Sequence, residues 1–457
     1  MARVSEKFAT LYRARREMSE PADLARLFLS RLYYSSEERL PATVTDLVQA
    51  LRSGRLKGLT GAKRGAFAAW LWRYAVLGQR TRGVSFYPIH PVLSRPLNRE
   101  EPRVDGFMLT LVRTFSSDER QLLHERLWES LPPFEQVVYD LVDWQTEDTE
   151  TMSWRTVEQV GPVDDPGLTP ASVKVLNQTR EDLLALAGEV SGMQSFSDHA
   201  GRLLALALAR FFLTQGKVEM SLPIYIAPAA DTHEGVRALA HEAIEVHRAL
   251  FERALHRQFQ KLYQEAVEEA GGDADVLDAD QARCLTKSIF HYNANVVPPE
   301  QAYYDALRNE HGDLCGVSYY YYWRRSGASS RFLRQIHAAQ LNLSKKAGIA
   351  NSRSRYSRWH YYWLAPSLVE TLLLASRPRL GGDQMLVVDL LRDWRDRYGL
   401  ALLIDESWED AYHANFRGLG NPEALNEANQ RRFNEMLSVR GRLLKNSDDF
   451  PWVILRD

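Results

Sequence analysis

The sequence predicts a mainly α-helical, multi-domain protein with short β elements, which ends in a winged-helix-like module. Apolar residues recur at spacings of three and four along most of the chain, as amphipathic helices require. At 457 residues, the chain is longer than one hydrophobic core usually supports. With 45% hydrophobic and 25% charged residues and a net charge of −2, the composition is that of an ordinary globular protein.

The N-terminal part of the chain predicts a basic helical domain followed by a connection. Residues 1–83 read as three or four helices and contain 16 Lys or Arg against 7 Asp or Glu. A helical bundle with a basic solvated face explains this charge, and a DNA-facing role is the alternative. Residues 84–115 hold four prolines before an apolar run, so we expect a Pro-rich connection that leads to one strand or a short helix.

Residues 116–310 predict a central helical domain. Ser116 stands three residues before Glu119, which is the spacing of a capping box at the start of a helix. Residues 203–213 are apolar almost all round, so we expect a buried helix there. Two further segments complete the domain: a strand and loop over 217–232, and a long amphipathic segment over 234–270.

The most unusual stretch is basic and aromatic, and we treat residues 311–363 as a separate segment built around it. Residues 314–369 contain nine Lys or Arg, eleven aromatic residues and no Asp or Glu. At the average acidic content of the chain, a window of this length would hold about seven acids. Positive charge combined with aromatic rings and no acid is typical of a surface that contacts phosphates and bases.

Three elements are expected inside this segment. Tyr319, Tyr321 and Trp323 would share one face of a strand. The following helix, which ends at Gly348, would turn an apolar seam including Leu343 inward and a cationic stripe outward. Residues 351–363 are expected to form a mobile Ser/Arg loop. The candidate nucleic-acid-binding residues are Arg324, Arg325, Arg331, Arg334, Lys345, Lys346, Arg353, Arg355 and Arg358 for phosphates, with Tyr356 and Trp359 for stacking.

Two other interpretations of the segment stay open. Trp323, Trp359 and Trp363 would be core residues if the arginines made ordinary salt bridges to acidic stretches such as 265–280. Alternatively, the basic surface would bind an acidic partner protein.

Residues 364–457 predict a small domain of helices and strands. Helices are expected after Pro366, over 385–399 with Gly399 as the stop, and after the Asn421 cap. Short strands are expected over 400–405 and 450–455. This order is close to a winged helix, a relative of the helix-turn-helix, and a small α+β docking domain is the alternative.

The sequence contains no recognisable catalytic motif, and we assign no catalytic residue, metal ligand or cofactor. There is no phosphate-binding GxxxxGK[ST] loop and no GxSxG motif. His233, His241 and His247 lie close in sequence, but the spacing does not place them on one helical face as ligands. Asp405 and Glu406 follow a strand, and these carboxylates would be the metal ligands of an unrecognised nuclease.

The last 90 or so residues resemble the C-terminal part of accessory proteins of prokaryotic anti-phage and restriction systems. The resemblance lies in LAPSLVETLLLAS, MLVVDLLRDWRDRYGLALLID and RRFNEMLSVRGRLLKNSDDFPWVI, and it implies a biological setting but no functional residue. From the basic-aromatic segment and the absence of a catalytic motif, we expect a cytoplasmic, non-catalytic protein that binds DNA or RNA, with DNA as the first expectation. We expect it to act beside an ATPase, helicase or nuclease, without contact with a membrane. The alternatives are a structural adaptor for an acidic partner protein and a metal-dependent nuclease.

Overall fold

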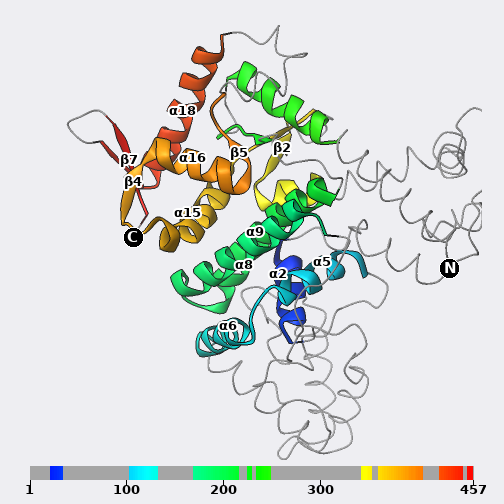
Figure 1. The fold of residues 1–457 in the computed structure, drawn as a ribbon. Coiled ribbons are helices and arrows are strands. Elements are labelled where there is room, and N and C mark those ends of the chain that lie inside the picture. Colours follow the sequence, from blue (N-terminus) through cyan, green and yellow to red (C-terminus); the bar gives the residue numbers. More distant parts are fainter. Residues whose placement is uncertain are drawn as a thin grey trace, which may run out of the picture.

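A computed structural model describes the chain over residues 21–33, 102–131, 168–215, 224–228, 233–248, 341–352, 359–404, 421–445 and 450–455 (Figure 1). Over these residues the protein is mainly helical with a few short strands, which confirms the predicted fold class at this level. None of the described helices is long and apolar enough to cross a membrane.

The N-terminal half of the described structure is a layer of packed helices. The element expected at the end of the Pro-rich connection is a helix rather than a strand. The helices are α2 (Pro21–Tyr33), α5 (Pro102–Arg113), α6 (Ser117–Glu129), α8 (Pro170–Glu189) and α9 (Met193–Gln215).

The capping box predicted at the start of α6 is confirmed. The Ser116 hydroxyl accepts the Glu119 N–H at 3.2 Å, and the Glu119 carboxylate accepts the Ser116 N–H at 2.8 Å. At the start of α8, the Thr169 side chain accepts the Ser172 N–H at 3.1 Å. These side chains satisfy backbone donors that the first helical turn leaves without an intrahelical acceptor.

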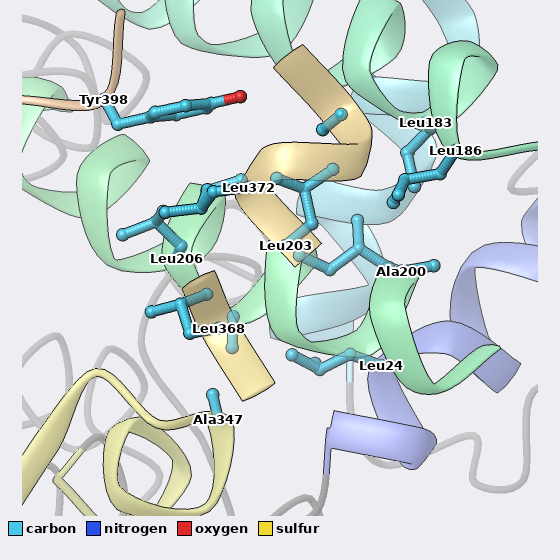
Figure 2. Packing of buried hydrophobic residues seen from close by; sticks show 14 of the residues in the cluster. Leu24, Leu183, Leu186, Ala200, Leu203, Leu206, Ala347, Leu368, Leu372 and Tyr398 are labelled. Atoms are coloured by element: carbon cyan, nitrogen blue, oxygen red, sulfur yellow. The ribbon is translucent and has the colours of Figure 1, made fainter. Parts of the chain in front are cut away.

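Helix α9 lies at the centre of the core, as its apolar sequence predicts. Every residue from Leu203 to Leu208 is at most 2% exposed. Around it, Leu24 of α2 and Leu372 of α15 (Pro366–Leu380) belong to the same cluster of buried residues (Figure 2). A Cβ added at Gly201 would lie 2.2 Å from the Pro21 carbonyl oxygen, so α9 and the start of α2 approach closely because this residue has no side chain.

Four short strands form a small mixed sheet beside this layer. They are β1 (Ile224–Tyr225), β2 (Ala350–Ser352), β3 (His360–Tyr362) and β5 (Leu400–Ala401). Strand β1 pairs in parallel with β5, and β2 pairs with β3 as an antiparallel hairpin. A parallel bridge between Ala227 and Trp363 joins the two pairs, so the strands run in the spatial order β5, β1, β3, β2.

The sheet separates two hydrophobic clusters, as alternating side chains in strands require. Ile226 and Leu400 face the large cluster that contains the helical layer. Tyr225, Tyr361 and Ala401 face a smaller cluster, which the helix over residues 234–248 covers from the other side. This arrangement places the hairpin against that helix.

The C-terminal part combines three helices with an antiparallel sheet. Helix α15 is followed by β4 (Gln384–Leu386), α16 (Val387–Tyr398), α18 (Pro422–Val439), β6 (Leu443–Lys445) and β7 (Pro451–Ile454). Strand β7 lies between β4 and β6. The predicted helix stop at Gly399 is confirmed, with a φ of 69°.

Two strands of this sheet are absent from the prediction. Met385 and Leu386 were expected inside a helix, but they pair with β7, and α16 begins only at Val387. Strand β6 continues directly from the turn after α18. A three-residue strand is too short for an alternating pattern to be recognised, and its partner is what stabilises it.

One buried cluster reaches from Leu24 to Leu455, and it includes Ile349 and Leu364. The cluster also includes Phe107 and Leu203, so its members come from all five segments into which the sequence was divided. The division into domains stays a prediction.

Candidate nucleic-acid interface

The described part of the basic-aromatic segment is organised around the β2–β3 hairpin. Ser352 pairs with His360, which is the last register pair before the connection between the two strands. The expectation of a loop over residues 351–363 is therefore wrong at both ends, because residues 351–352 belong to β2 and residues 360–362 form β3. Residues 353–358, with the sequence RSRYSR, join the two strands in the sequence and lie outside the described residues.

Of the predicted site residues, the structure describes Lys345, Lys346 and Trp359. Lys345 and Trp359 lie at the hairpin: Trp359 directly precedes β3, and the charge of Lys345 acts on His360. The other predicted site residues lie outside the described residues: Arg324, Arg325, Arg331, Arg334, Arg353, Arg355, Arg358 and Tyr356.

The two lysines lie at the end of a helix whose orientation matches the predicted seam. Leu343 is 4% exposed and belongs to the large cluster, so the apolar side of the helix faces the core there. Lys345 is half-buried and Lys346 is exposed. Burial lowers the pKa of Lys345 from its usual range. The helix ends at Gly348, whose φ is 82°, as predicted.

Trp359 is less available for stacking than the sequence suggested. Its ring lies 4.8 Å from the His241 ring and 5.8 Å from the Tyr361 ring, measured between centroids. It is half-buried against the small cluster, and so is Trp363. Part of the Trp359 surface is thus used in packing, and a nucleic-acid base would have only the remainder to contact.

Two histidines of the helix over 234–248 hold the hairpin, one on each side of the buried Tyr361. His241 Nδ1 lies 2.6 Å from the His360 carbonyl oxygen. His247 Nδ1 lies 2.9 Å from the Tyr362 hydroxyl, and burial lowers the pKa of His247 to about 4. Sequence reasoning considered these histidines only as metal ligands, and their neighbours across the fold could not be read from the chain.

His233, the third histidine of that stretch, does not join the other two in a site. Its Nδ1 accepts the N–H of Gly235 at 3.1 Å, and its side chain is exposed. Among the described residues, no group of His, Cys, Asp or Glu is arranged to hold a metal ion. Asp405 and Glu406 lie outside the described residues.

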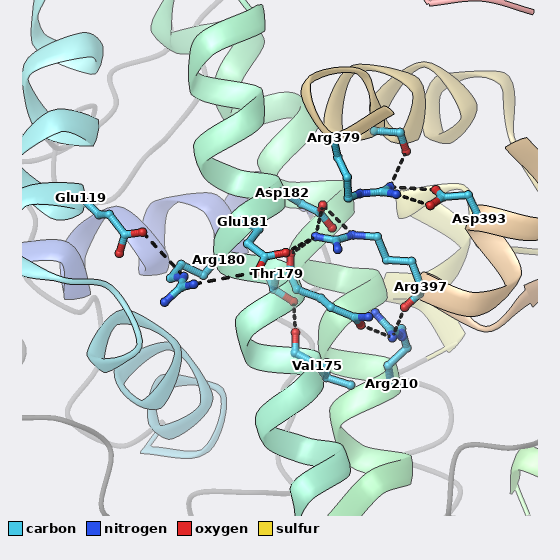
Figure 3. A network of polar contacts seen from close by, with 12 residues as sticks. Glu119, Val175, Thr179, Arg180, Glu181, Asp182, Arg210, Arg379, Asp393 and Arg397 are labelled. Carbon is cyan, nitrogen blue, oxygen red and sulfur yellow. Dashed lines mark hydrogen bonds and ion pairs between the residues drawn. The ribbon is translucent and has the colours of Figure 1, made fainter. Parts of the chain in front are cut away.

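A second charged cluster lies in the interior between α8, α9 and α16 (Figure 3). Arg397 Nε and Nη2 donate to Asp182 Oδ1 at 2.9 and 2.6 Å, and Arg210 Nη2 donates to Gln178 Oε1 at 2.8 Å. The Tyr398 ring lies 5.8 Å from the Arg210 guanidinium carbon and 5.9 Å from that of Arg397.

Burial sets the protonation of this interior cluster. Burial raises the pKa of Asp182 to about 6, against the opposing effect of Arg397. It also lowers the pKa of Arg210 to about 10. The side chains of Asp182 and Arg397 are only 2% and 9% exposed. A ligand in solution cannot reach such groups, so we assign the cluster a structural role.

Comparison of the chain with protein-family models, curated proteins and solved structures finds no match.

Proposed function

We propose that this chain is a non-catalytic nucleic-acid-binding protein, and that the β2–β3 hairpin is the centre of its interface. The observation that carries the proposal is the register of the hairpin. It places Ser352 beside His360, and the stretch of sequence between them contains three arginines and no acid. Lys345 lies close enough for its charge to act on His360 at the same end of β3. Concentrated positive charge of this kind suits a phosphate backbone.

The C-terminal topology supports a winged-helix module within this proposal. Helix α15, strand β4, helix α16, helix α18 and strands β6 and β7 follow one another, with β5 inserted after α16, and β7 is the central strand of the sheet. This is the order of elements in winged helices, which are helix-turn-helix relatives.

The surface charge of α18 favours the hairpin over this helix as the phosphate contact. Its exposed or half-exposed positions include Glu423, Glu427 and Glu435 beside Arg431 and Arg432. Arg432 is paired with Glu435 at 2.7 Å. Acidic residues on a DNA-facing helix repel phosphates, so we place the main electrostatic contact at the hairpin.

The proposal includes a partner with motor or nuclease activity and a setting in prokaryotic anti-phage defence. The resemblance of the C-terminal sequence to accessory proteins of such systems supports this setting.

A structural adaptor is the second candidate, and the outer face of the C-terminal sheet favours it. The register places Leu386, Trp452 and Leu444 in one row on the face opposite buried Val453. Leu444 is 38% exposed, and the neighbouring Phe450 is 61% exposed. An apolar sheet face of this kind is typical of a protein-docking surface.

The test measures the affinity for duplex and single-stranded DNA by fluorescence anisotropy, at salt concentrations from about 50 to about 300 mM. Phosphate contacts weaken strongly as salt rises over such a range. Replacing Arg353, Arg355 and Arg358 together by Ala should reduce the slope of log affinity against log salt by about one per lost phosphate contact. The matched control, Arg431→Ala with Arg432→Ala on α18, should leave the slope almost unchanged.

An unchanged slope in the hairpin variant would exclude the hairpin as the interface. If neither DNA form binds at low salt, the nucleic-acid proposal is wrong. The adaptor function is then supported if Leu444→Glu also releases a protein that the wild-type chain retains.

A further inference from the structure

Three groups that can each carry positive charge lie near the first residue of β3. They are the imidazole of His360, the imidazole of His241 from the helix over 234–248, and the amine of Lys345. A carbonyl oxygen can only accept a hydrogen bond, so the 2.6 Å contact to the His360 carbonyl requires that His241 Nδ1 carries the proton. His241 Nε2 is therefore the nitrogen at which this ring can gain a proton.

The ring of His241 is fixed in this position from two sides. Its Nδ1 is bound to the β3 backbone, and its face packs against Trp359 at 4.8 Å between ring centroids, with the planes inclined by 35°. On its own helix, Arg237 and Glu245 lie one turn to either side. Glu245 is within 3.6 Å of Arg248.

The charges around His360 are positive. Burial, the amine of Lys345 and the imidazole of His241 together lower the pKa of His360 to about 4. Its Nδ1 is buried without a hydrogen-bond partner among the described residues, and Lys345 forms no ion pair among them. A buried nitrogen without a partner, near an amine that forms no ion pair with any described carboxylate, favours binding of an anion.

We propose that His241, His360 and Lys345 form a phosphate-binding site, in which the imidazoles take up protons when the phosphate binds. The identity of the molecule that carries the phosphate rests on the proposed function: a phosphate of the nucleic-acid backbone beside the hairpin. A phosphate oxygen accepts N–H donors, and its negative charge favours the protonated form of a neighbouring imidazole.

Proton uptake has a measurable consequence. For each proton that binding takes up, the affinity rises by up to about tenfold per unit decrease in pH. We therefore expect nucleic acid to bind more tightly at pH 6 than at pH 8 when the ionic strength is held constant. Contacts by arginine alone would not change across this range, because its side chain stays protonated.

The first arm of the experiment uses a labelled single-stranded oligonucleotide and measures its affinity by anisotropy from pH 6 to pH 8. We expect about a tenfold increase toward pH 6 for the wild-type chain. His241→Gln and His360→Gln keep a polar side chain that cannot be protonated, and each should flatten the pH profile. His233→Gln on the same helix is the control and should retain the wild-type profile, because its side chain lies outside the cluster and is exposed.

The second arm adds inorganic phosphate to the full-length protein and follows the imidazole Cε1–H resonances by NMR, assigned with the same variants. Shifts confined to His241 and His360 would support the phosphate site even if no oligonucleotide binds, an outcome in which the nucleic-acid function alone fails. If the oligonucleotide binds with the same pH profile in wild type and Gln variants, and phosphate moves neither resonance, the phosphate site is wrong and the nucleic-acid function stands.

Discussion

The buried ion pair between Asp182 and Arg397 offers a quantitative test of how the helical layer is joined to the C-terminal helices. Arg397→Met keeps most of the side-chain volume and removes the charge, which leaves the Asp182 carboxylate, 2% exposed, without its cation. Removing one partner of a buried pair costs about 3–5 kcal/mol. We expect about 3 kcal/mol at pH 7, since Asp182 can limit the loss by taking up a proton.

The protonation of Asp182 also determines how this loss of stability depends on pH. With a pKa of about 6, Asp182 is mainly ionised at pH 7 and mainly protonated at pH 5 in the wild-type protein. The attraction to Arg397 therefore contributes less at pH 5, and the difference between wild type and Arg397→Met should shrink by about 1 kcal/mol. Taken alone, the raised pKa of Asp182 means that its contribution to stability falls as pH rises from about 4 to about 6.

Urea denaturation, followed by intrinsic tryptophan fluorescence to which the buried Trp394 contributes, measures these free energies. The matched control is Arg379→Met, because the Arg379–Asp393 pair lies nearby with side chains 29% and 18% exposed. We expect the control to lose at most about 1 kcal/mol. Replacing both buried partners, Asp182→Leu with Arg397→Met, should recover most of the loss. Equal small losses in Arg397→Met and Arg379→Met would refute this reasoning.

Two further variants test the packing around the candidate site and the core. His247, held by Tyr362 and with a pKa lowered to about 4, stabilises the fold in its neutral form above pH 6.5, and this contribution is lost as pH falls toward 4. The ordinary pKa of histidine is 6.5, so the free energy of unfolding of the wild type should fall between pH 7.5 and pH 4.5. In His247→Asn, urea denaturation should show a fall that is smaller by about 2–3 kcal/mol. Equal falls in both proteins would contradict the assignment. Gly201→Ala forces a Cβ to within 2.2 Å of the Pro21 carbonyl oxygen and should lower the free energy of unfolding by about 1–3 kcal/mol. The control is Gly382→Ala, in which the nearest contact of the added Cβ is 3.5 Å, and it should change the melting temperature little. Similar shifts of the melting temperature in both variants would argue against the close approach.

Local rules identified the helix boundaries of this protein well. The Ser116–Glu119 capping box, the Gly348 stop and the Gly399 stop are each present where the sequence placed them. Each depends on backbone groups within a few residues, so the chain alone contains the necessary information. The buried position of Leu203–Leu208 also follows from sequence, because a helix that is apolar on all sides cannot remain in water.

The candidate site could be predicted only in part, because local signals do not include its long-range contacts. The charge and aromatic content of residues 314–369 are visible in the sequence. The contact of His241 with Trp359 and with the His360 backbone joins positions that are more than a hundred residues apart. No local pattern links these positions, since they meet only when β3 pairs beside β1 and the helix over 234–248 packs on the sheet.

The sequence by itself determined that the chain is mainly helical, where several helices begin and end, and that positive charge gathers before the C-terminal helices. The tertiary structure decided the three-residue strands, the hairpin that closes the Ser/Arg connection, and the pairing of Asp182 with Arg397 across a separation of 215 residues. Helix formation is driven by interactions within a few turns, whereas a short strand or a buried ion pair is stable only when a distant partner desolvates and satisfies it.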